Sequence, residues 1–281
     1  MARAILGGYA ADRIAFAFAA GYHAALGALV GVLPADARVA LCATEEGGAH
    51  PRAIHTTLKE APDGRLRLDG TKRFVTLASL ADELLIVATR GTGADGRPRL
   101  VLVRVPVHTA GVTLEPLPDL PFASEVPHAA VRLDDVRVDA SAVLEGDGYD
   151  RYLKPFRTIE DVHVHAALLS FLVRVARRDG WEPVEIERLV SLVAGAHTLA
   201  LAPPSDAAVH VALAGLIAAS RELVASTMPR WQKAPVEERS RFERDLRLMR
   251  VAETARNART ESAWRSLAAA ETQASVTGGR G

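Results

Sequence analysis

The period of the apolar residues changes twice along this chain of 281 residues. Up to about residue 35, and again beyond residue 150, apolar side chains recur every three or four positions, as on one face of a helix. Between residues 38 and 148 they form short runs bounded by glycine, proline and aspartate, a pattern typical of strands and turns. The sequence therefore predicts a multi-layer α+β fold whose strands are gathered in the middle of the chain.

Three zones are expected from these changes of period. Residues 1–37 would form a short N-terminal helical segment, and residues 38–148 a β-barrel or β-sandwich domain. Residues 149–281 would form an antiparallel bundle of four helices joined by short connections. The apolar first segment is too short to bury itself, so it must pack on later parts of the chain or on a partner.

The middle zone contains apolar or alternating runs that are expected to be strands. They lie at 39–43, 65–68, 84–88, 100–105 and 129–133. Turn residues separate them at 62–64, 69–70, 93–96 and 116–121. Several short strands at this spacing favour a compact barrel or sandwich.

Start and stop signals divide the last zone into four expected helices. They are placed at 159–178, 182–202, 205–228 and from about 235 onward. Pro183 suits a first helical turn, and Asp206 is an expected N-cap. Pro229 is expected to mark the end of the third helix.

Residues 14–33 carry no formally charged side chain and are numerous enough to span a membrane. Much of this stretch is alanine and glycine, which contribute little transfer free energy, and Pro34 follows it directly. It lacks the strong leucine-type core and cleavage site of a signal peptide. We interpret it as a helix buried inside protein, and we expect no membrane partner.

The composition argues against nucleic-acid binding and against a site built from several cysteines. Lys plus Arg and Asp plus Glu both number 34, so the formal net charge is zero and no nucleic-acid partner is expected. A net charge near zero also favours self-association. Cys42 is the only cysteine, which excludes an intrachain disulfide or multi-thiolate metal site and agrees with a cytoplasmic location.

Asp161, His163 and His165 invite interpretation as a metal site because they cluster on an expected helix. Residues two positions apart on a helix point about 200° away from each other. Such side chains do not converge on one ion, so capping and packing are the expected roles and no metal site is predicted.

Five segments of the middle zone carry a recognisable pattern. Residues 43–50 read Ala-Thr-Glu-Glu-Gly-Gly-Ala-His, and residues 68–76 read Leu-Asp-Gly-Thr-Lys-Arg-Phe-Val-Thr. Residues 81–88, 103–112 and 133–148 continue the pattern. In order and spacing these segments resemble the middle domain of the acyl-CoA dehydrogenase family, including its Thr-Glu-Pro-x-Ala-Gly-Ser-Asp and Gly-x-Lys-x-(Trp or Phe)-Ile-Thr segments. The chain looks like a shortened, divergent member.

The resemblance implies a flavoprotein that holds FAD between a β-domain and a helical bundle. In the family, a carboxylate base takes a proton from the substrate and the flavin takes a hydride. By position, Ala43 and Thr44 would approach the isoalloxazine ring, Phe74 would pack on a ring face, and Thr76 would hydrogen-bond the ring edge. The alternative is a purely structural role, in which Phe74 belongs to the core and the two threonines are present because they favour strands.

The resemblance assigns one further residue and leaves the catalytic residue open. His50 stands where the family has its Ser-Asp pair, so it is the candidate for substrate contact. We assign no catalytic residue, because no glutamate lies in a recognisable catalytic-base segment.

The resemblance leaves three functions open. The first is FAD-dependent oxidation of an acyl thioester or a related substrate, as an oxidoreductase acting on a CH–CH bond. The second is a catalytically silent binding or assembly subunit of the same fold, favoured by the short N-terminal segment and by the lack of a Gln-x-(Phe or His)-Gly-Gly-x-Gly segment. The third is a flavin-dependent monooxygenase. A homodimer or homotetramer is expected, or a hetero-oligomer with a longer homologue.

Overall fold

The computed structural model describes residues 1–31, 33 and 37–278 of the chain. The chain divides into two compact units. Residues 26–157 form the first, called here the β unit, and residues 1–25 together with 158–281 form the second, called the helical unit.

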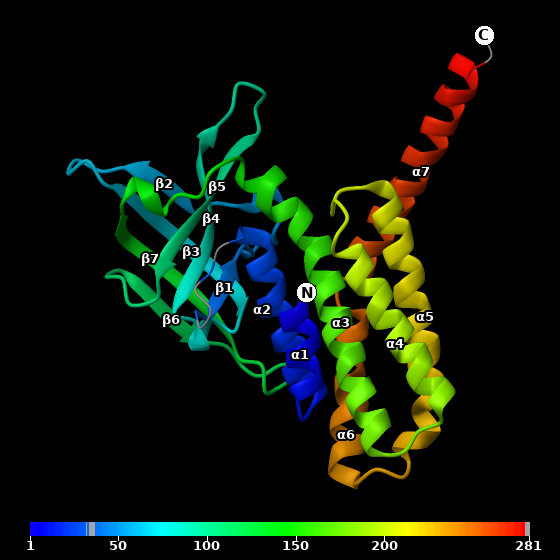
Figure 1. The fold of residues 1–281 in the computed structure, drawn as a ribbon. Coiled ribbons are helices and arrows are strands. Elements are labelled where there is room, and N and C mark those ends of the chain that lie inside the picture. The colour runs from blue at the N-terminus through cyan, green and yellow to red at the C-terminus, as the bar shows by residue number, and fades with distance from the viewer. Residues whose placement is uncertain (32, 34–36, 279–281) are drawn as a thin grey trace. The chain divides into compact units, whose positions relative to one another are not determined.

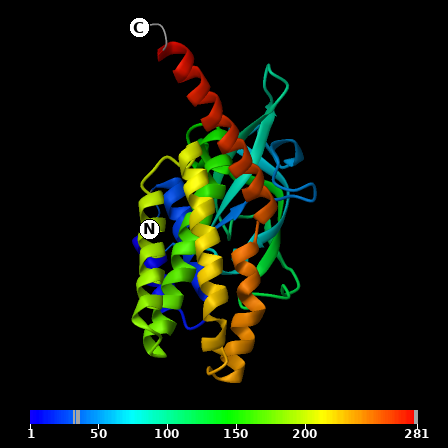
Figure 2. The same ribbon diagram turned by 90° about the vertical axis from the view of Figure 1, so that its right-hand side faces the viewer.

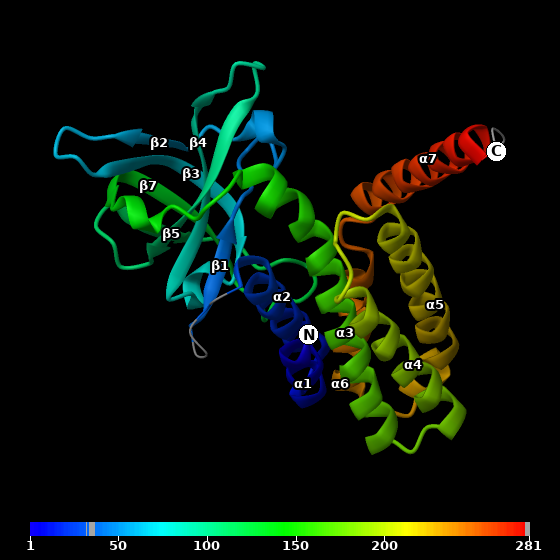
Figure 3. The same ribbon diagram turned by 45° about the horizontal axis from the view of Figure 1, so that its top comes forward.

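The strands of the β unit form one curled sheet (Figures 1 and 3). Its order is β1-β4-β2-β3-β7-β6, and β5 pairs with β4 on the other side. The strands are β1 (Val39–Cys42), β2 (Thr57–Glu60), β3 (Leu66–Thr76), β4 (Glu83–Thr92), β5 (Pro98–Pro106), β6 (Val112–Pro116) and β7 (His128–Val138). β1 runs parallel to β4, whereas β3 pairs antiparallel with both β2 and β7.

The five expected strands are confirmed within β1, β3, β4, β5 and β7. Two strands were not expected, β2 and β6, because their burial is partial and their apolar residues are few. The turn expected at 69–70 is wrong: these residues lie inside β3, where the register with β7 shifts between Leu68 and Gly70. Gly70 has a φ of +152° there, so the glycine serves a β-bulge instead of a chain reversal.

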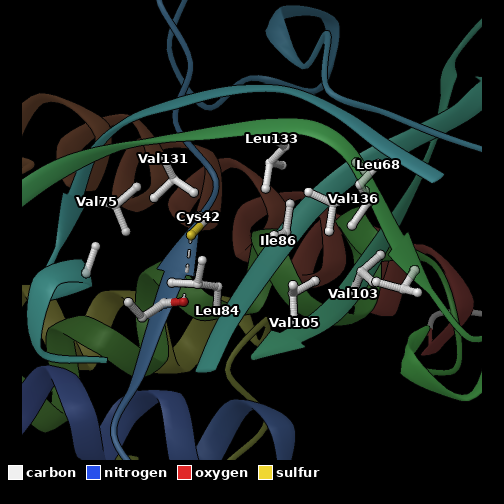
Figure 4. Packing of buried hydrophobic residues seen from close by; sticks show 14 of the residues in the cluster. Cys42, Leu68, Val75, Leu84, Ile86, Val103, Val105, Val131, Leu133 and Val136 are labelled. Carbon is white, nitrogen blue, oxygen red and sulfur yellow. Dashed lines mark hydrogen bonds between the residues drawn. The ribbon is translucent and has the colours of Figure 1, made fainter. Parts of the chain in front are cut away.

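The core of the β unit lies inside the curl of the sheet. Alternate side chains point inward, such as Leu84 and Ile86 on β4 (Figure 4). Their neighbours in this cluster come from other strands and include Cys42, Leu68, Val75, Val103, Val105, Val131, Leu133 and Val136. The period-two geometry of a strand therefore places every second residue on this face, while Leu85 and Val87 of β4 are buried on the other face.

Two helices open the chain, α1 (Ala2–Ala10) and α2 (Ile14–Val30). Glycines allow both to approach α3 (Lys154–Arg178) closely: a Cβ on Gly8 would lie 2.2 Å from the carbonyl oxygen of Ala167, and one on Gly21 would lie 2.7 Å from the Cα of Val164. Many α2 side chains are buried, Ile14 among them, as expected of a helix inside protein.

The remaining helices of the helical unit are α4 (Pro183–Leu199), α5 (Ala207–Trp231), α6 (Val236–Asp245) and α7 (Glu253–Gly278). Figure 2 shows α4 and α5 running side by side, and α5 also contacts α7. The expected N-cap is confirmed, since the Asp206 carboxylate accepts the Ala208 amide. Glu182 with Glu185 forms a capping box before α4, which was not predicted.

Two predicted helix ends in this unit are wrong. α5 continues through Pro229 to Trp231, because a proline in the last turn interrupts the hydrogen-bond ladder only where the helix is about to end. The expected last helix is divided into α6, a 3₁₀ turn at Leu246–Arg250, and α7. Ala252, with a φ of +59°, breaks the helix before Glu253.

Within the described residues, α5 is the helix long and apolar enough to cross a membrane by composition. Its buried residues, such as Val209, Leu213 and Ile217, recur every four positions, as on a helix that packs one face against neighbouring helices. α2 is shorter, with 17 residues.

Candidate functional site

Phe74 lies outside the regular ladder of β3. The register with β7 shifts between Lys72 and Val75, so one extra residue is accommodated there. Phe74 has a φ of +57°, and its side chain is 57% exposed. A bulky residue in this backbone region costs about 1–3 kcal/mol, and such strain is concentrated at functional sites. Because its side chain is exposed, Phe74 is not a core residue, and the alternative that placed it in the core is wrong.

Thr76 ends the same strand beside a second strained residue. Leu77 has a φ of +62°, and its amide donates to the Pro127 carbonyl oxygen at 2.8 Å. Thr76 pairs with His128 across the sheet, and its Oγ1 lies 3.2 Å from the His128 Nε2. The segment 74–77 is thus held in one unusual backbone path by its neighbours on β7.

Thr44 is joined to this segment through the backbone. Its carbonyl oxygen accepts the Arg73 amide at 2.9 Å. Ala43, directly before it, is buried, with 8% of its surface exposed. The Arg73 guanidinium lies 5.7 Å from the centre of the Phe74 ring. The structure thus brings together the two predicted flavin segments, 43–44 and 74–76.

A buried ion pair reinforces the same connection. The Lys72 Nζ donates to the Glu45 Oε1 at 2.7 Å, and the lysine side chain is fully buried. The Glu45 carboxylate also accepts the Thr56 amide and hydroxyl and the His55 amide. Because these donors satisfy the carboxylate, residues 45 and 72 are cross-linked one position away from the link between Thr44 and Arg73.

The pair changes the acid–base properties of its members. Burial favours a raised pKa of Glu45, but Lys72 and the amides of Thr56 and His55 together outweigh it and lower that pKa. Burial lowers the pKa of Lys72, with Glu45 opposing the shift.

Burial also raises the pKa of the Cys42 thiol to about 12, so this thiol is unreactive in the folded state.

His50, the predicted substrate residue, lies elsewhere on the β unit. It precedes the 3₁₀ turn Pro51–Ala53, where its Nδ1 accepts the Arg52 amide at 3.3 Å. It lines an open cavity of about 590 Å³. The other lining residues are Pro51, Arg52, Asp95, Arg97, Pro98, Arg99, Asp147, Tyr149 and Asp150. The flavin segments do not contribute to this lining.

The segment around Phe74 fits an aromatic cofactor. An exposed aromatic side chain offers one wall for a flat ring system, and the Thr76 hydroxyl and backbone groups offer polar partners for its edge. A structure that strains its backbone to expose a phenyl ring is consistent with a flavin. Contact of Ala43, Thr44, Phe74 and Thr76 with a flavin, and of His50 with substrate, stays a prediction.

Three participants were not singled out from the sequence. Glu45 and Lys72 belong to the two motif segments, and Lys72 is one of four lysines among 34 basic residues, a signal that a lysine is specifically required there. His128 shows no signal of its own. Its place opposite Thr76 follows only from the register of β3 and β7.

The cluster that invited a metal interpretation packs as expected. The Nδ1 atoms of His163 and His165 lie 2.8 Å from the Ile159 and Asp161 carbonyl oxygens, one turn back. The Asp161 carboxylate accepts from the guanidinium of Arg256 at 2.8 Å. Among the described residues no group of three or more histidine, cysteine, aspartate or glutamate side chains could hold a metal ion.

Residues 40–136, which contain most of the β unit and the segments above, match the family model "Acyl-CoA dehydrogenase, middle domain". These residues form an acyl-CoA dehydrogenase middle domain. The match contains Thr44, Phe74, Thr76 and His128. The chain has no match among curated proteins.

Solved structures have the same fold at low identity. Butyryl-CoA dehydrogenase from Megasphaera elsdenii is 14% identical with a TM-score of 0.65, over 90% of this chain and 78% of that one. FMN-bound TdsC from Paenibacillus sp. A11-2 is 19% identical with a TM-score of 0.63, over 84% and 75%. The electron transferring flavoprotein structure of Acidaminococcus fermentans is 13% identical with a TM-score of 0.66, over 89% and 78%. These likenesses establish the acyl-CoA dehydrogenase-like fold.

Proposed function

We propose that this chain is a flavin-dependent oxidoreductase that oxidises an acyl thioester or a related substrate. The observation that carries the proposal is the exposed Phe74 ring, held at a φ of +57° inside a segment that resembles a flavin-binding one. The β unit would contact FAD through Ala43, Thr44, Phe74 and Thr76.

Each of these residues has a distinct task in the proposal. The Phe74 ring covers one face of the isoalloxazine and excludes water from it. The Thr76 hydroxyl sets the position of the ring edge, and the backbone at Ala43 and Thr44 supplies further polar partners. A bound flavin would supply the electron acceptor for the oxidation.

The cavity at His50 offers arginines to an anionic part of the substrate. Arg52, Arg97 and Arg99 line it beside the imidazole. Three aspartates line it too, and Arg97 lies 3.7 Å from one of them, Asp95, so Arg52 and Arg99 are the candidates for the anion. Guanidinium groups bind phosphates through paired hydrogen bonds, and the phosphate-bearing arm of an acyl thioester such as a coenzyme A ester has that chemistry. We assign His50 to this arm and leave the catalytic base unassigned.

The first test is the absorbance spectrum of the purified chain after incubation with FAD. Flavin absorbance retained through gel filtration supports the proposal, and a colourless protein that does not take up FAD contradicts it. Phe74→Ala is expected to weaken FAD binding at least tenfold. Phe16→Ala is the matched control, because Phe16 is also exposed and also lies beside an arginine but belongs to α2.

The second test separates this function from its alternatives. Reduction of an artificial electron acceptor by acyl-CoA supports the dehydrogenase, whereas oxygen-dependent hydroxylation indicates the monooxygenase. Flavin binding without either activity, or copurification of a longer homologous chain, indicates a silent assembly subunit. Chromatography of the released flavin distinguishes FAD from FMN, the flavin named in the TdsC structure.

The assembly belongs to the same proposal. We propose that α3 to α7 form the antiparallel bundle of the fold, around the contacts of α5 with α4 and α7. A homodimer or homotetramer in the cytoplasm fits the zero net charge and the single cysteine. Light scattering on the purified protein measures this oligomeric state.

A further inference from the structure

His165 is a buried histidine of α3 that the proposed function does not use. Only 1% of its surface is exposed, and its Nδ1 lies 2.8 Å from the Asp161 carbonyl oxygen. A carbonyl oxygen only accepts, so Nδ1 carries a proton and donates it. Nε2 of the neutral ring is then bare, and among the described residues it has no hydrogen-bond partner.

The Asp161 side chain, one helical turn before His165, ties α3 to α7. Its Oδ1 accepts from the Arg256 Nη2 at 2.8 Å, and its Oδ2 accepts from the Arg259 Nη2 at 2.5 Å. Both Asp161 and Arg256 are buried. Residues four apart on a helix lie on the same face, so His165 lies on the face of α3 that holds α7.

The first turn of α7 is also tied to α5. The Arg221 guanidinium of α5 donates to the Glu253 carboxylate at 2.5 Å. It also donates to the Met249 carbonyl oxygen at 3.0 Å, just before α7 begins. The start of α7 is therefore held by charged side chains of both α3 and α5.

The surroundings of His165 oppose its protonation. The nearby arginines only donate hydrogen bonds, so they cannot accept from a protonated Nε2. Burial disfavours the charged ring most, and the positive charges of Arg256 on α7 and Arg221 on α5 add to this, while Asp161 opposes it. Together these groups lower the pKa of His165 to about 4. Arg259 and Glu253 complete the charged network around the ring.

We propose that His165 is an acid-sensitive latch, whose neutral ring allows α7 to dock on α3 and whose protonation at Nε2 releases the first turns of α7. The inference goes beyond the proposed function and requires no flavin. In the released form water hydrates the ring, and its pKa returns to about 6.5. The released form therefore binds the proton more tightly, so release becomes more favourable as pH falls from about 6.5 towards 4.

The test is hydrogen exchange of the α7 amides, measured by mass spectrometry as protection relative to the unfolded chain at each pH. Between pH 7 and pH 5 the protection of residues 257–264 should fall about twentyfold, the ratio expected when the pKa of His165 rises from about 4 to about 6.5 on release. The amides of α4, which contributes no charged group to the latch, should change less than about threefold.

His165→Asn is the variant that removes the titration. Its side-chain amide can still donate to the Asp161 carbonyl oxygen, so the α7 protection should no longer fall between pH 7 and pH 5. If His165→Asn does not fold, His165→Phe, which also has no titrating group, should give the same result.

His163→Asn is the matched control. His163 is also buried on α3, and its Nδ1 donates to the Ile159 carbonyl oxygen at 2.8 Å, but two positions along a helix turn it away from His165. This variant should keep the twentyfold decline. Three results would overturn the inference: equal α7 protection at both pH values in the wild type, an equal decline in the variant without His165, or an equal loss in α4 and α7.

Discussion

Phe74 has a strained backbone and an exposed ring. The strain lowers the stability of the fold, whereas the exposed ring is the part proposed to bind the flavin. A phenylalanine at a φ of +57° is strained, while its 57% exposed ring contributes little burial. Phe74→Gly should therefore raise the free energy of unfolding by about 0.5–1 kcal/mol, since glycine adopts positive φ without a steric cost. Urea denaturation measures the gain, and FAD titration the expected loss of binding.

The neighbouring residue provides the control for Phe74. Arg73 is also exposed, but it is not among the described residues with positive φ. Arg73→Gly should lower stability, because glycine gains nothing there and loses backbone entropy. If Phe74→Gly and Arg73→Gly changed the free energy of unfolding equally, the backbone at Phe74 would not be strained.

The buried ion pair predicts a large loss from a single substitution. Lys72→Met leaves the Glu45 carboxylate buried without its counter-charge, which should cost about 3–5 kcal/mol of unfolding free energy. Lys154→Met is the matched control, because Lys154 lies 3.7 Å from Asp150 with both side chains exposed. That variant should change stability by less than about 1 kcal/mol in the same urea titration.

The lowered pKa of Glu45 predicts how this stability depends on pH. A carboxyl group whose pKa is lower in the folded state stabilises the protein above its unfolded pKa of about 4.3. The contribution is lost as pH falls through the folded value. The stability difference between wild type and Glu45→Gln should be constant from pH 7 to 5 and shrink below pH 4. A difference that does not change between pH 7 and pH 3 contradicts the assignment.

At this scale the sequence reveals residue types better than their contacts. Thr44, Phe74 and Thr76 could be selected because they stand in recognisable segments, and the structure joins those segments through Arg73. The exposure of Phe74 could not be predicted, since an aromatic residue in a strand is usually buried. His128 could not be found at all, because its partner is set by pairing of residues 52 positions apart.

At the scale of elements, the strands that could be predicted are those with continuous or alternating apolar residues. β4 and β5 bury most of their central residues, so their runs are unambiguous. β2 has one buried residue and ends in Lys59 and Glu60, so nothing marks it as a strand. Asp69-Gly70 shows the limit of turn signals, because glycine with a positive φ is used both in turns and in β-bulges.

Helix packing yields a prediction from two glycines that differ only in their surroundings. A Cβ on Gly8 would lie 2.2 Å from the Ala167 carbonyl oxygen, whereas one on Gly215 of α5 would meet nothing within 4 Å. Gly8→Ala should therefore lower the free energy of unfolding by about 1–3 kcal/mol through overpacking. Gly215→Ala should raise it by up to about 1 kcal/mol, because alanine favours the helix.

Thermal and urea unfolding of the two variants measure this contrast. Circular dichroism should report the native helix content for Gly215→Ala, with a higher unfolding midpoint. If both substitutions shift the midpoint in the same direction, the close approach of α1 to α3 is not what requires glycine at position 8.

At the scale of the whole molecule, the change of hydrophobic period predicted the succession of helices, strands and helices. The compact units follow a different division, since residues 1–25 belong with 158–281. No local pattern signals that the two ends of a chain share one unit, because this depends on long-range packing such as Gly8 and Gly21 against α3.

The two units carry separate natural probes of unfolding. Cys42, the only cysteine, is buried in the β unit. All three tryptophans lie in the helical unit, and Trp181 and Trp231 are buried there. Because each unit has its own core, we expect two separable transitions in urea. Alkylation of Cys42 reports the unfolding of the β unit, and tryptophan fluorescence reports the unfolding of the helical unit.

One core substitution in each unit tests this expectation. Leu84→Ala, in the β unit, should lower the stability reported by Cys42 by about 2–5 kcal/mol and leave the fluorescence transition in place. Leu213→Ala, on α5, should lower the stability reported by fluorescence by a similar amount and leave the Cys42 transition in place. The amounts are similar because both leucine side chains are almost fully buried. If either variant shifts both probes equally, the chain unfolds as one cooperative body, because the loss of one core then removes the other.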